Sequence, residues 1–261
     1  MIAAVHPYLD WPGPIAFAHR GGTSVAPENT LPAFEHAVAL GYRFLETDVH
    51  LSADGALVAF HDTDLRRTCG VDRRIADVTV DELAEIRVGG DATIPLMGDL
   101  LERFPDARFN IDCKADDAVD ALVRLVREHD ALDRVCLGAF SHGRLTRLRG
   151  LLGPGLLTCA SPPEVAVLRL TGRIPARFGR GVRRAAQVPP RSGRPGGRRT
   201  IAVVTAGFVR AAHRAGIPVH VWTIDEADEM HRLLDLGVDG IMTDRPEVLR
   251  AVLVERDAWH E

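Results

Sequence analysis

Two carboxylates stand two residues apart in an apolar run that reads FLETDVH. Side chains alternate along a β-strand, so Glu46 and Asp48 would share one face while Leu45 and Val49 take the other. Two carboxylates on one inward face repel each other and cost stability unless a cation lies between them. The spacing therefore predicts a divalent cation site, and all-oxygen ligands favour Mg²⁺ or Ca²⁺ over Zn²⁺.

A histidine lies close to this pair in the expected hairpin. The dipeptide Asp54-Gly55 is typical of two-residue hairpin turns. Counting outward from that turn places Asp48 directly opposite His61, with Cβ atoms roughly 5 Å apart. A one-residue bulge would change this register. Because an imidazole titrates near neutral pH, His61 is a candidate general acid or base.

Two further segments carry polar side chains at strand ends. In FAHRGG, His19 and Arg20 precede two glycines, whose N–H groups we expect to approach an anion closely. In RFNIDCK, alternation puts Asp112 and Lys114 on one face, and Lys114 is the only lysine of the chain. Two cations and two imidazoles beside three carboxylates suit the chemistry of a phosphoryl group. The following PENT predicts a helix that Asn29 caps.

Eight apolar segments of strand length alternate with amphipathic segments of helical period. We predict strands at Ile15–His19, Phe44–Val49, Arg108–Cys113, Val135–Ala139, Leu156–Ala160, Ala185–Val188, Pro218–Trp222 and Gly240–Thr243. We predict helices between them at, for example, Asn29–Ala39, Asp116–His129, Pro162–Leu170, Thr205–Ala215 and Glu226–Leu236. Eight alternations favour a single α/β domain over residues 1–261, a closed (β/α)8 TIM barrel, and an open doubly wound sheet is the alternative. Active sites of such barrels lie at the carboxyl ends of the strands, where Trp222 is a candidate pocket wall.

Two segments interrupt the alternation. Residues 62–95 follow the second strand and read as a small insertion, and residues 189–199, PPRSGRPGGRR, read as a mobile loop on the catalytic face. Residues 165–222 contain twelve arginines and no Asp or Glu. We expect the loop arginines to steer anionic substrates, with a solvated surface as the alternative. We expect residues 169–184 to lie mostly on the far side or in the preceding helix.

Composition and charge narrow the function classes. The 261 residues are 46% hydrophobic and 26% charged with a net charge of -4, which is ordinary for a soluble protein and does not call for nucleic acid. No stretch approaches ~18 apolar residues and the N-terminus lacks an export signal, so we expect no membrane span and a cytoplasmic location. Four cysteines without a C-x-x-C pair read as free thiols, with the last three buried: Cys69, Cys113, Cys136 and Cys159. The sequence is silent on oligomeric state.

The motifs together resemble the glycerophosphodiester phosphodiesterase family. HRGG, PENT, E-x-D, DG and HD occur in that order, and NIDCK, VWTID and GVDGIMTDRPE resemble the family's later strand segments. The resemblance implies that His19 and His61 act as acid and base and that Glu46 and Asp48 bind the metal. It also implies that Arg20 holds the phosphate. In that family the metal ligand on the third strand is commonly glutamate. Asp112 has a shorter side chain, so it would bind the metal either directly or through a bridging water.

The resemblance implies hydrolysis of a small glycerophosphodiester to sn-glycerol 3-phosphate and an alcohol. Aromatic residues are only 5% of the chain and few fall at strand ends, so we expect no platform for nucleobases and no long apolar trough for lipids. One alternative is a lysophospholipase D-like or other phospholipid-cleaving barrel, although residues 62–95 offer few bulky apolar side chains. The other is a catalytically inactive binding barrel. For single residues the alternatives are structural: a salt bridge for Arg20, an ion pair with Asp112 for Lys114, and core packing for Trp222.

Overall fold

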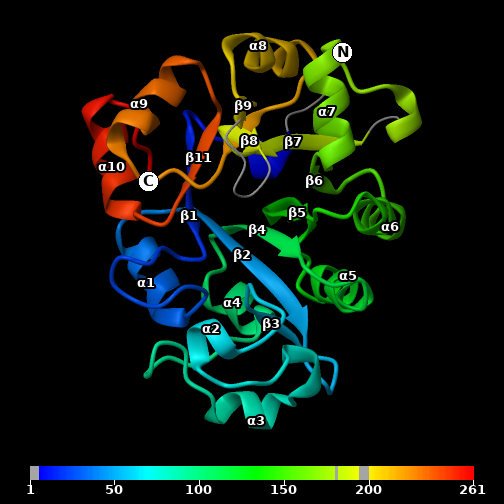
Figure 1. The fold of residues 1–261 in the computed structure, drawn as a ribbon, viewed down its shortest axis with the longest axis vertical. Coiled ribbons are helices and arrows are strands. Elements are labelled where there is room, and N and C mark those ends of the chain that lie inside the picture. The colour runs from blue at the N-terminus through cyan, green and yellow to red at the C-terminus, as the bar shows by residue number, and fades with distance from the viewer. Residues whose placement is uncertain (1–5, 180–181, 194–199) are drawn as a thin grey trace.

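Eight parallel strands close into a barrel in the computed structural model, which describes residues 6–179, 182–193 and 200–261. Their order is β1-β11-β10-β7-β6-β5-β4-β2, and pairing of β1 with β2 closes the circle (Figure 1). The strands are β1 (Ile15–His19), β2 (Phe44–Leu51), β4 (Arg108–Cys113), β5 (Val135–Gly138), β6 (Leu157–Cys159), β7 (Arg183–Val188), β10 (Val219–Val221) and β11 (Gly240–Thr243). The predicted (β/α)8 barrel is confirmed, the open sheet is wrong, and no predicted strand end is more than two residues off.

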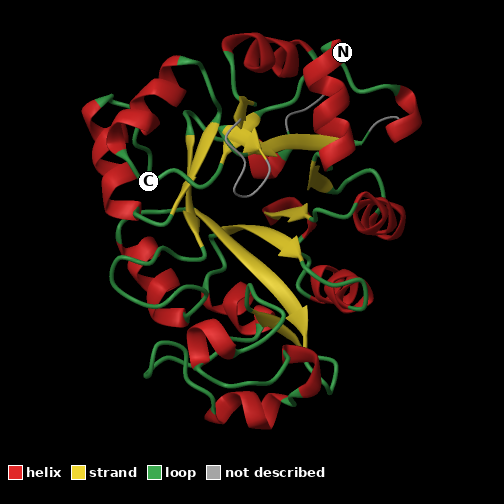
Figure 2. Ribbon diagram, in the orientation of Figure 1, coloured by secondary structure: helices red, strands yellow, loops and turns green. Residues whose placement is uncertain are grey.

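Helices surround the strands (Figure 2). The α-helices are α1 (Leu31–Ala39), α2 (Arg66–Cys69), α3 (Val80–Glu85), α4 (Met97–Arg103), α5 (Ala118–Glu128), α6 (His142–Leu152), α7 (Pro162–Thr171), α8 (Ala206–Arg214), α9 (Ala227–Asp235) and α10 (Pro246–Glu255). Short 3-10 helices lie at η1 (Pro7–Leu9), η2 (Ile75–Asp77), η3 (Leu132–Arg134) and η4 (Ala176–Phe178).

The alternation of side chains along the strands separates two cores. Phe17 and Phe44 point into the barrel and stack edge to face at 5.4 Å between ring centroids. Leu45 and Val49 belong to the larger core between strands and helices. Because Glu46 and Asp48 share the parity of Phe44, they face the barrel interior, as the sequence predicts.

The hairpin of β2 with β3 (Leu57–Ala59) has a different register from the one predicted. Ser52 N–H donates to the Ala56 carbonyl at 2.9 Å, so the turn has three residues, the last of which is Gly55 at φ 87°. Such loops pair a turn with a left-handed residue that is usually glycine. The extra residue shifts the register by one, and the N–H of Phe60, not His61, donates to the Asp48 carbonyl. The predicted pairing of Asp48 with His61 is therefore wrong.

The segment 62–95 folds over the end of this hairpin as α2, η2 and α3, at the lower edge of Figure 1. It has a small apolar cluster of its own, which packs on Val58 and Phe60 of the hairpin. The cluster buries Leu65, Ile75, Val78, Leu83, Val88 and Ile94. Its apolar side chains are thus used for packing within the segment.

The arginine-rich segment 165–222 divides into different environments. Arg169 lies on α7, whereas Arg184 is buried and donates to Glu164 at 2.8 Å. Part of the expected loop 189–199 is a strand, β8 (Arg191–Gly193), paired with β9 (Thr200–Ala202). The remaining loop arginines lie outside the described residues: Arg194, Arg198 and Arg199.

All four cysteines are free thiols, as expected. Cys113, Cys136 and Cys159 are buried, and Cys69 is half-buried. Among the described residues, no helix combines the length and apolar character that crossing a bilayer requires.

Candidate active site

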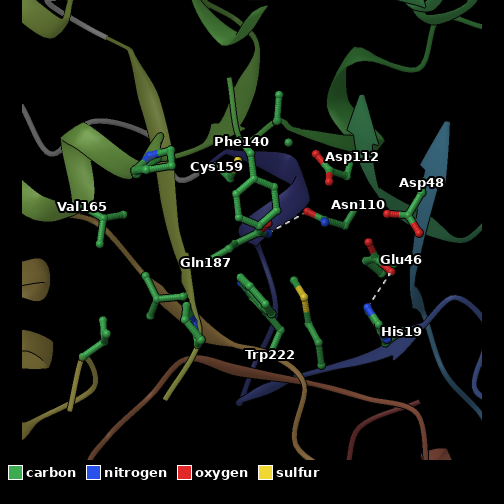
Figure 3. A pocket seen from close by; sticks show the side chains of 18 of the residues that line it. His19, Glu46, Asp48, Asn110, Asp112, Phe140, Cys159, Val165, Gln187 and Trp222 are labelled. Carbon is green, nitrogen blue, oxygen red and sulfur yellow. Dashed lines mark hydrogen bonds and ion pairs between the residues drawn. The ribbon is translucent and has the colours of Figure 1, made fainter. Parts of the chain in front are cut away.

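A cavity of about 510 Å³ opens at the carboxyl ends of the barrel strands (Figure 3). It brings together every residue that the sequence singled out for chemistry, from five different strands and the turns that follow them. These residues are His19, Arg20, Glu46, Asp48, His61, Asp112, Lys114 and Trp222. A cavity of this size holds a small organic ligand.

The carboxylates of β2 and β4 are held side by side by strand pairing. Asp48 is in register with Asp112, and the Lys114 ammonium lies 2.7 Å from Asp48 Oδ1 and 2.6 Å from Asp112 Oδ2. Burial lowers the pKa of Lys114, but Asp112 and Asp48 outweigh it and the pKa is raised overall. Lys114 therefore stays charged between its two carboxylates.

Glu46 is a carboxylate whose negative charge is disfavoured by its surroundings. Its side chain is buried, and burial together with the neighbouring Asp48 raises its pKa to about 7. The Arg20 backbone N–H donates to Glu46 Oε2 at 3.1 Å. A carboxylate with so high a pKa binds either a proton or an added cation near neutral pH.

His19 is oriented by Asp244, a carboxylate that directly follows the last strand. Its Nδ1 lies 2.6 Å from Asp244 Oδ1, and its Nε2 lies 3.8 Å from Glu46 Oε2. Burial lowers the pKa of His19, whereas Glu46 and Asp244 raise it, and the net shift is upward. Asp244 thus fixes the ring and leaves Nε2 turned toward the carboxylate pair.

His61 has a similar partner. Its Nδ1 lies 2.6 Å from Asp62 Oδ1, and the Asp62 carboxylate accepts from Arg67 Nε at 2.5 Å. The Arg67 guanidinium also donates to both oxygens of Glu28, which in turn accepts from Arg20 at 2.9 Å. Burial raises the pKa values of Asp62 and Glu28, but Arg67 outweighs it and both pKa values are lowered. A chain of charged groups therefore links His61 to Arg20, which follow two of the strands that pair with β2.

Arg20 sits on a left-handed turn that aims its side chain at Asp48. Its φ is 53°, and its Nε lies 3.1 Å from Asp48 Oδ2, close enough for an ion pair but without hydrogen-bond geometry. The next two amides donate to the carbonyls of Ala18 and His19, so the expectation that they approach an anion is wrong. Gly21 is needed for a different reason, because a Cβ there would lie 2.9 Å from the backbone of α1.

Asn29 does not cap a helix, contrary to the sequence prediction. The helix begins at Leu31 after Thr30, and Asn29 is buried at φ 55°. Its Nδ2 donates to Asp48 Oδ2 at 3.3 Å, and its Oδ1 accepts from Thr47 at 2.8 Å. Asn29 therefore positions a site carboxylate.

Several other site residues were missed by sequence reasoning. Asp62 and Asp244 each follow a residue or strand already singled out, in HD and TDRP, so their positions carried a signal. Phe140 and Trp222 both follow strands and meet edge to face at 5.9 Å. The expectation of few aromatics at strand ends therefore misses the wall that these two residues build.

The carboxylates suit a divalent cation in chemistry but not in their present arrangement. Glu46, Asp48 and Asp112 offer only oxygen donors, which Mg²⁺ and Ca²⁺ prefer. In residues 6–179, 182–193 and 200–261, however, no three His, Cys, Asp or Glu side chains converge to enclose a metal ion. The Lys114 ammonium lies between two of the three carboxylates instead. Binding of a cation would require Lys114 to move aside.

Comparison with known proteins gives consistent matches. The sequence profile of the glycerophosphoryl diester phosphodiesterase family matches residues 19–248. A Mycobacterium tuberculosis protein named "probable glycerophosphodiester phosphodiesterase 2" is 38% identical over 259 residues, covering 97% of this chain and 95% of the relative. A human protein named lysophospholipase D is 30% identical over 280 residues, covering 90% of this chain and 85% of the relative.

A solved structure shares the fold. It is that of an Oleispira antarctica phosphodiesterase in complex with the product sn-glycerol-3-phosphate. The two chains superpose with a TM-score of 0.76 at 23% identity, covering 93% of this chain and 97% of the other.

Proposed function

This chain belongs to the glycerophosphoryl diester phosphodiesterase family and is a phosphoric diester hydrolase, and we propose that it cleaves glycerophosphodiesters with the help of one divalent cation. The products would be sn-glycerol 3-phosphate and a free alcohol, and the Oleispira relative, solved with that phosphate as its product, supports this choice. One observation carries the proposal. Two imidazoles, each with Nδ1 held by a carboxylate, line the same 510 Å³ cavity as two cations and three carboxylates.

The chain's own groups divide the work between binding and proton transfer. Arg20 and Lys114 hold the non-bridging phosphoryl oxygens and stabilise the negative charge that builds on them. One imidazole accepts a proton from the attacking water at Nε2, and the other donates a proton to the leaving alkoxide. The carboxylates Asp244 and Asp62 keep Nδ1 of each ring occupied, so that Nε2 is the nitrogen that exchanges protons.

Glu46, Asp48 and Asp112 would hold the cation. When bound, Mg²⁺ or Ca²⁺ would polarise a phosphoryl oxygen as a Lewis acid. The raised pKa of Glu46 supports this site, because burial and the neighbouring Asp48 disfavour a negative charge that a bound cation would stabilise. Lys114 would then turn from its carboxylates toward the phosphate.

The test is hydrolysis of glycerophosphocholine with and without a chelator. We expect sn-glycerol 3-phosphate and choline to appear, the chelator to abolish turnover, and Mg²⁺ or Ca²⁺ to restore it. Glu46→Gln should remain inactive with metal, and the exposed Asp72→Asn is the matched control. Full turnover by Glu46→Gln in excess chelator would exclude the metal, and no turnover with metal would favour an inactive binding barrel.

The human relative's name makes single-chain phospholipids a second substrate class. Part of the cavity wall is apolar, and this surface is relevant to whether such substrates bind.

A further inference from the structure

The cavity has two unlike halves. Charged groups occupy the end near His19, Glu46 and Asp48, whereas the opposite end, around Phe140, Val165 and Trp222, is apolar (Figure 3). The apolar half was not expected from the sequence, because none of the segments that build it is a long apolar run. It is built by the loops after β5, β7 and β10 and by α7.

One face of α7 forms a continuous apolar strip along the cavity. Pro162, Val165, Ala166 and Arg169 line it at helical spacing, so they lie on the same side of the helix. The seven helical steps from the first to the last of these residues span ~10 Å at 1.5 Å per residue. At its end, the aliphatic stem of Arg169 can continue the apolar surface while its guanidinium stays in water.

Apolar residues from other segments line the same cavity. Val188, Pro189 and Val203 come from the end of β7 and the residues beside the β8–β9 hairpin. Together with the α7 strip they form an apolar groove in the cavity that also holds the reacting centre.

This groove leaves a large aromatic side chain in contact with water. Phe140 is 65% exposed although its ring meets Trp222 at the cavity wall. Exposed apolar surface that is continuous with a polar reaction centre is a common mark of a ligand with both characters. A phosphodiester head followed by a hydrocarbon chain has that pattern.

We propose that the apolar half binds the single acyl chain of a lysophospholipid while the charged half holds its phosphodiester. The inference rests on the proposed function, because the same imidazoles would cleave the bond. Water adds to phosphorus, the bond from phosphorus to the head-group oxygen breaks, and one imidazole protonates that oxygen while the other takes a proton from the water. The products are an acylglycerol phosphate and the head-group alcohol, and no further reactant is needed.

The experiment compares substrates that differ only in chain length. Glycerophosphocholine and its acetyl, butyryl, hexanoyl and octanoyl monoesters are measured below the concentrations at which they form micelles, so a membrane surface plays no part. We expect kcat/KM to rise by up to about fourfold for each buried methylene, the factor that corresponds to ~0.8 kcal/mol. A series that is flat or falls with chain length overturns the inference.

Variants of the groove residues test whether the rise in kcat/KM with chain length comes from this groove. Val165→Asp and Phe140→Ser should remove most of the dependence on chain length, and Val165→Leu should retain it. Leu170→Ser is the matched control, because Leu170 lies on the same helix, is 83% exposed and does not line the cavity. If both groove variants keep the full dependence on chain length, the chain binds elsewhere and the inference fails.

The two proposals fail in different ways. Turnover of glycerophosphocholine with no gain from a chain would overturn only the acyl subsite. Absence of turnover for every member of the series would overturn the proposed function and the subsite with it.

Discussion

At the scale of single residues, the site is a set of side chains whose neighbours fix their charge and orientation. His19 and His61 each present one nitrogen to a carboxylate at 2.6 Å, and both rings line the cavity. Asp244 is 225 residues from His19 in the sequence, whereas Asp62 directly follows His61. A distant residue and an adjacent residue therefore provide the same kind of contact.

Replacing either imidazole should impair chemistry more than binding. His19→Ala and His61→Ala should each lower kcat by about 10²-fold or more, the usual contribution of a general acid or base, with little change in KM. Steady-state kinetics on glycerophosphocholine measure both constants. His36→Ala, which removes an ion pair to Glu247 outside the cavity, is the control. A variant of His19 or His61 that retained wild-type kcat would remove that histidine from the mechanism.

The role of His19 can be read from the pH profile of an Asp244→Asn variant. Asp244 raises the pKa of His19, so its neutralisation should lower that pKa and move one limb of the kcat profile to lower pH. If the acidic limb moves, His19 acts as the base, because activity there needs the neutral ring. If the alkaline limb moves, His19 acts as the acid. Two unmoved limbs would show that Asp244 does not set the titration of His19.

At the scale of elements, the insertion contributes to the site without entering the barrel. Arg67 on α2 binds Asp62 and Glu28, and these carboxylates contact His61 and Arg20. The segment 62–95 is itself anchored on the β2–β3 hairpin by its own apolar cluster. An element outside the barrel therefore links His61 and Arg20, two residues of the cavity that follow different strands.

Loss of this link should lower activity while the fold remains. Arg67→Gln should lower kcat by about tenfold, because ~1.4 kcal/mol of positioning at the reacting groups corresponds to that factor. Arg66→Gln is the matched control, since the guanidinium of the neighbouring Arg66 pairs with the exposed Asp72 and does not line the catalytic cavity. Kinetics and thermal unfolding are measured on both variants. Equal kcat values for the two variants would contradict a positioning role for Arg67.

At the scale of the whole molecule, charge is unevenly distributed over an ordinary barrel. The net charge is -4, yet residues 165–222 contain twelve arginines and no acidic residue. This region includes α7 and the β8–β9 hairpin, parts of which line the cavity. Arg169 lines the cavity and Arg191 is next to Ser192, which also lines it, so their charges should attract anionic substrates over a Debye length of about 8 Å in physiological salt.

Neutralising the loop arginines should weaken this attraction mainly at low salt. Glutamine at Arg191, Arg194, Arg198 and Arg199 should reduce kcat/KM in dilute buffer and have little effect at high salt, because salt screens exposed charges. The control neutralises four exposed arginines on other parts of the surface that do not line the cavity: Arg66, Arg73, Arg103 and Arg147. An unchanged salt profile in the loop variant would mean that these arginines are only solvated surface.

The sequence by itself determined the features that local chain geometry controls. Strand alternation is a fixed property of the extended backbone, so it correctly placed Glu46 and Asp48 inside the barrel and Leu45 and Val49 outside. The alternation of eight strand-like segments with helical segments predicted the barrel, because eight parallel strands are the number that closes one. Strand ends then gathered the eight candidate residues in one cavity, because parallel strands end at the same face.

Only the tertiary structure decided the features that depend on how distant segments meet. One extra residue in the hairpin turn moved His61 out of register with Asp48, and a turn's length is set by packing as much as by its own sequence. Asn29 became a carboxylate partner, and Asp244 reached His19 across 225 residues of sequence. The apolar half of the cavity arises from α7 and three separate loops, none of which is a long apolar run. Its existence depends on side chains from separate segments facing one space, which no local pattern encodes.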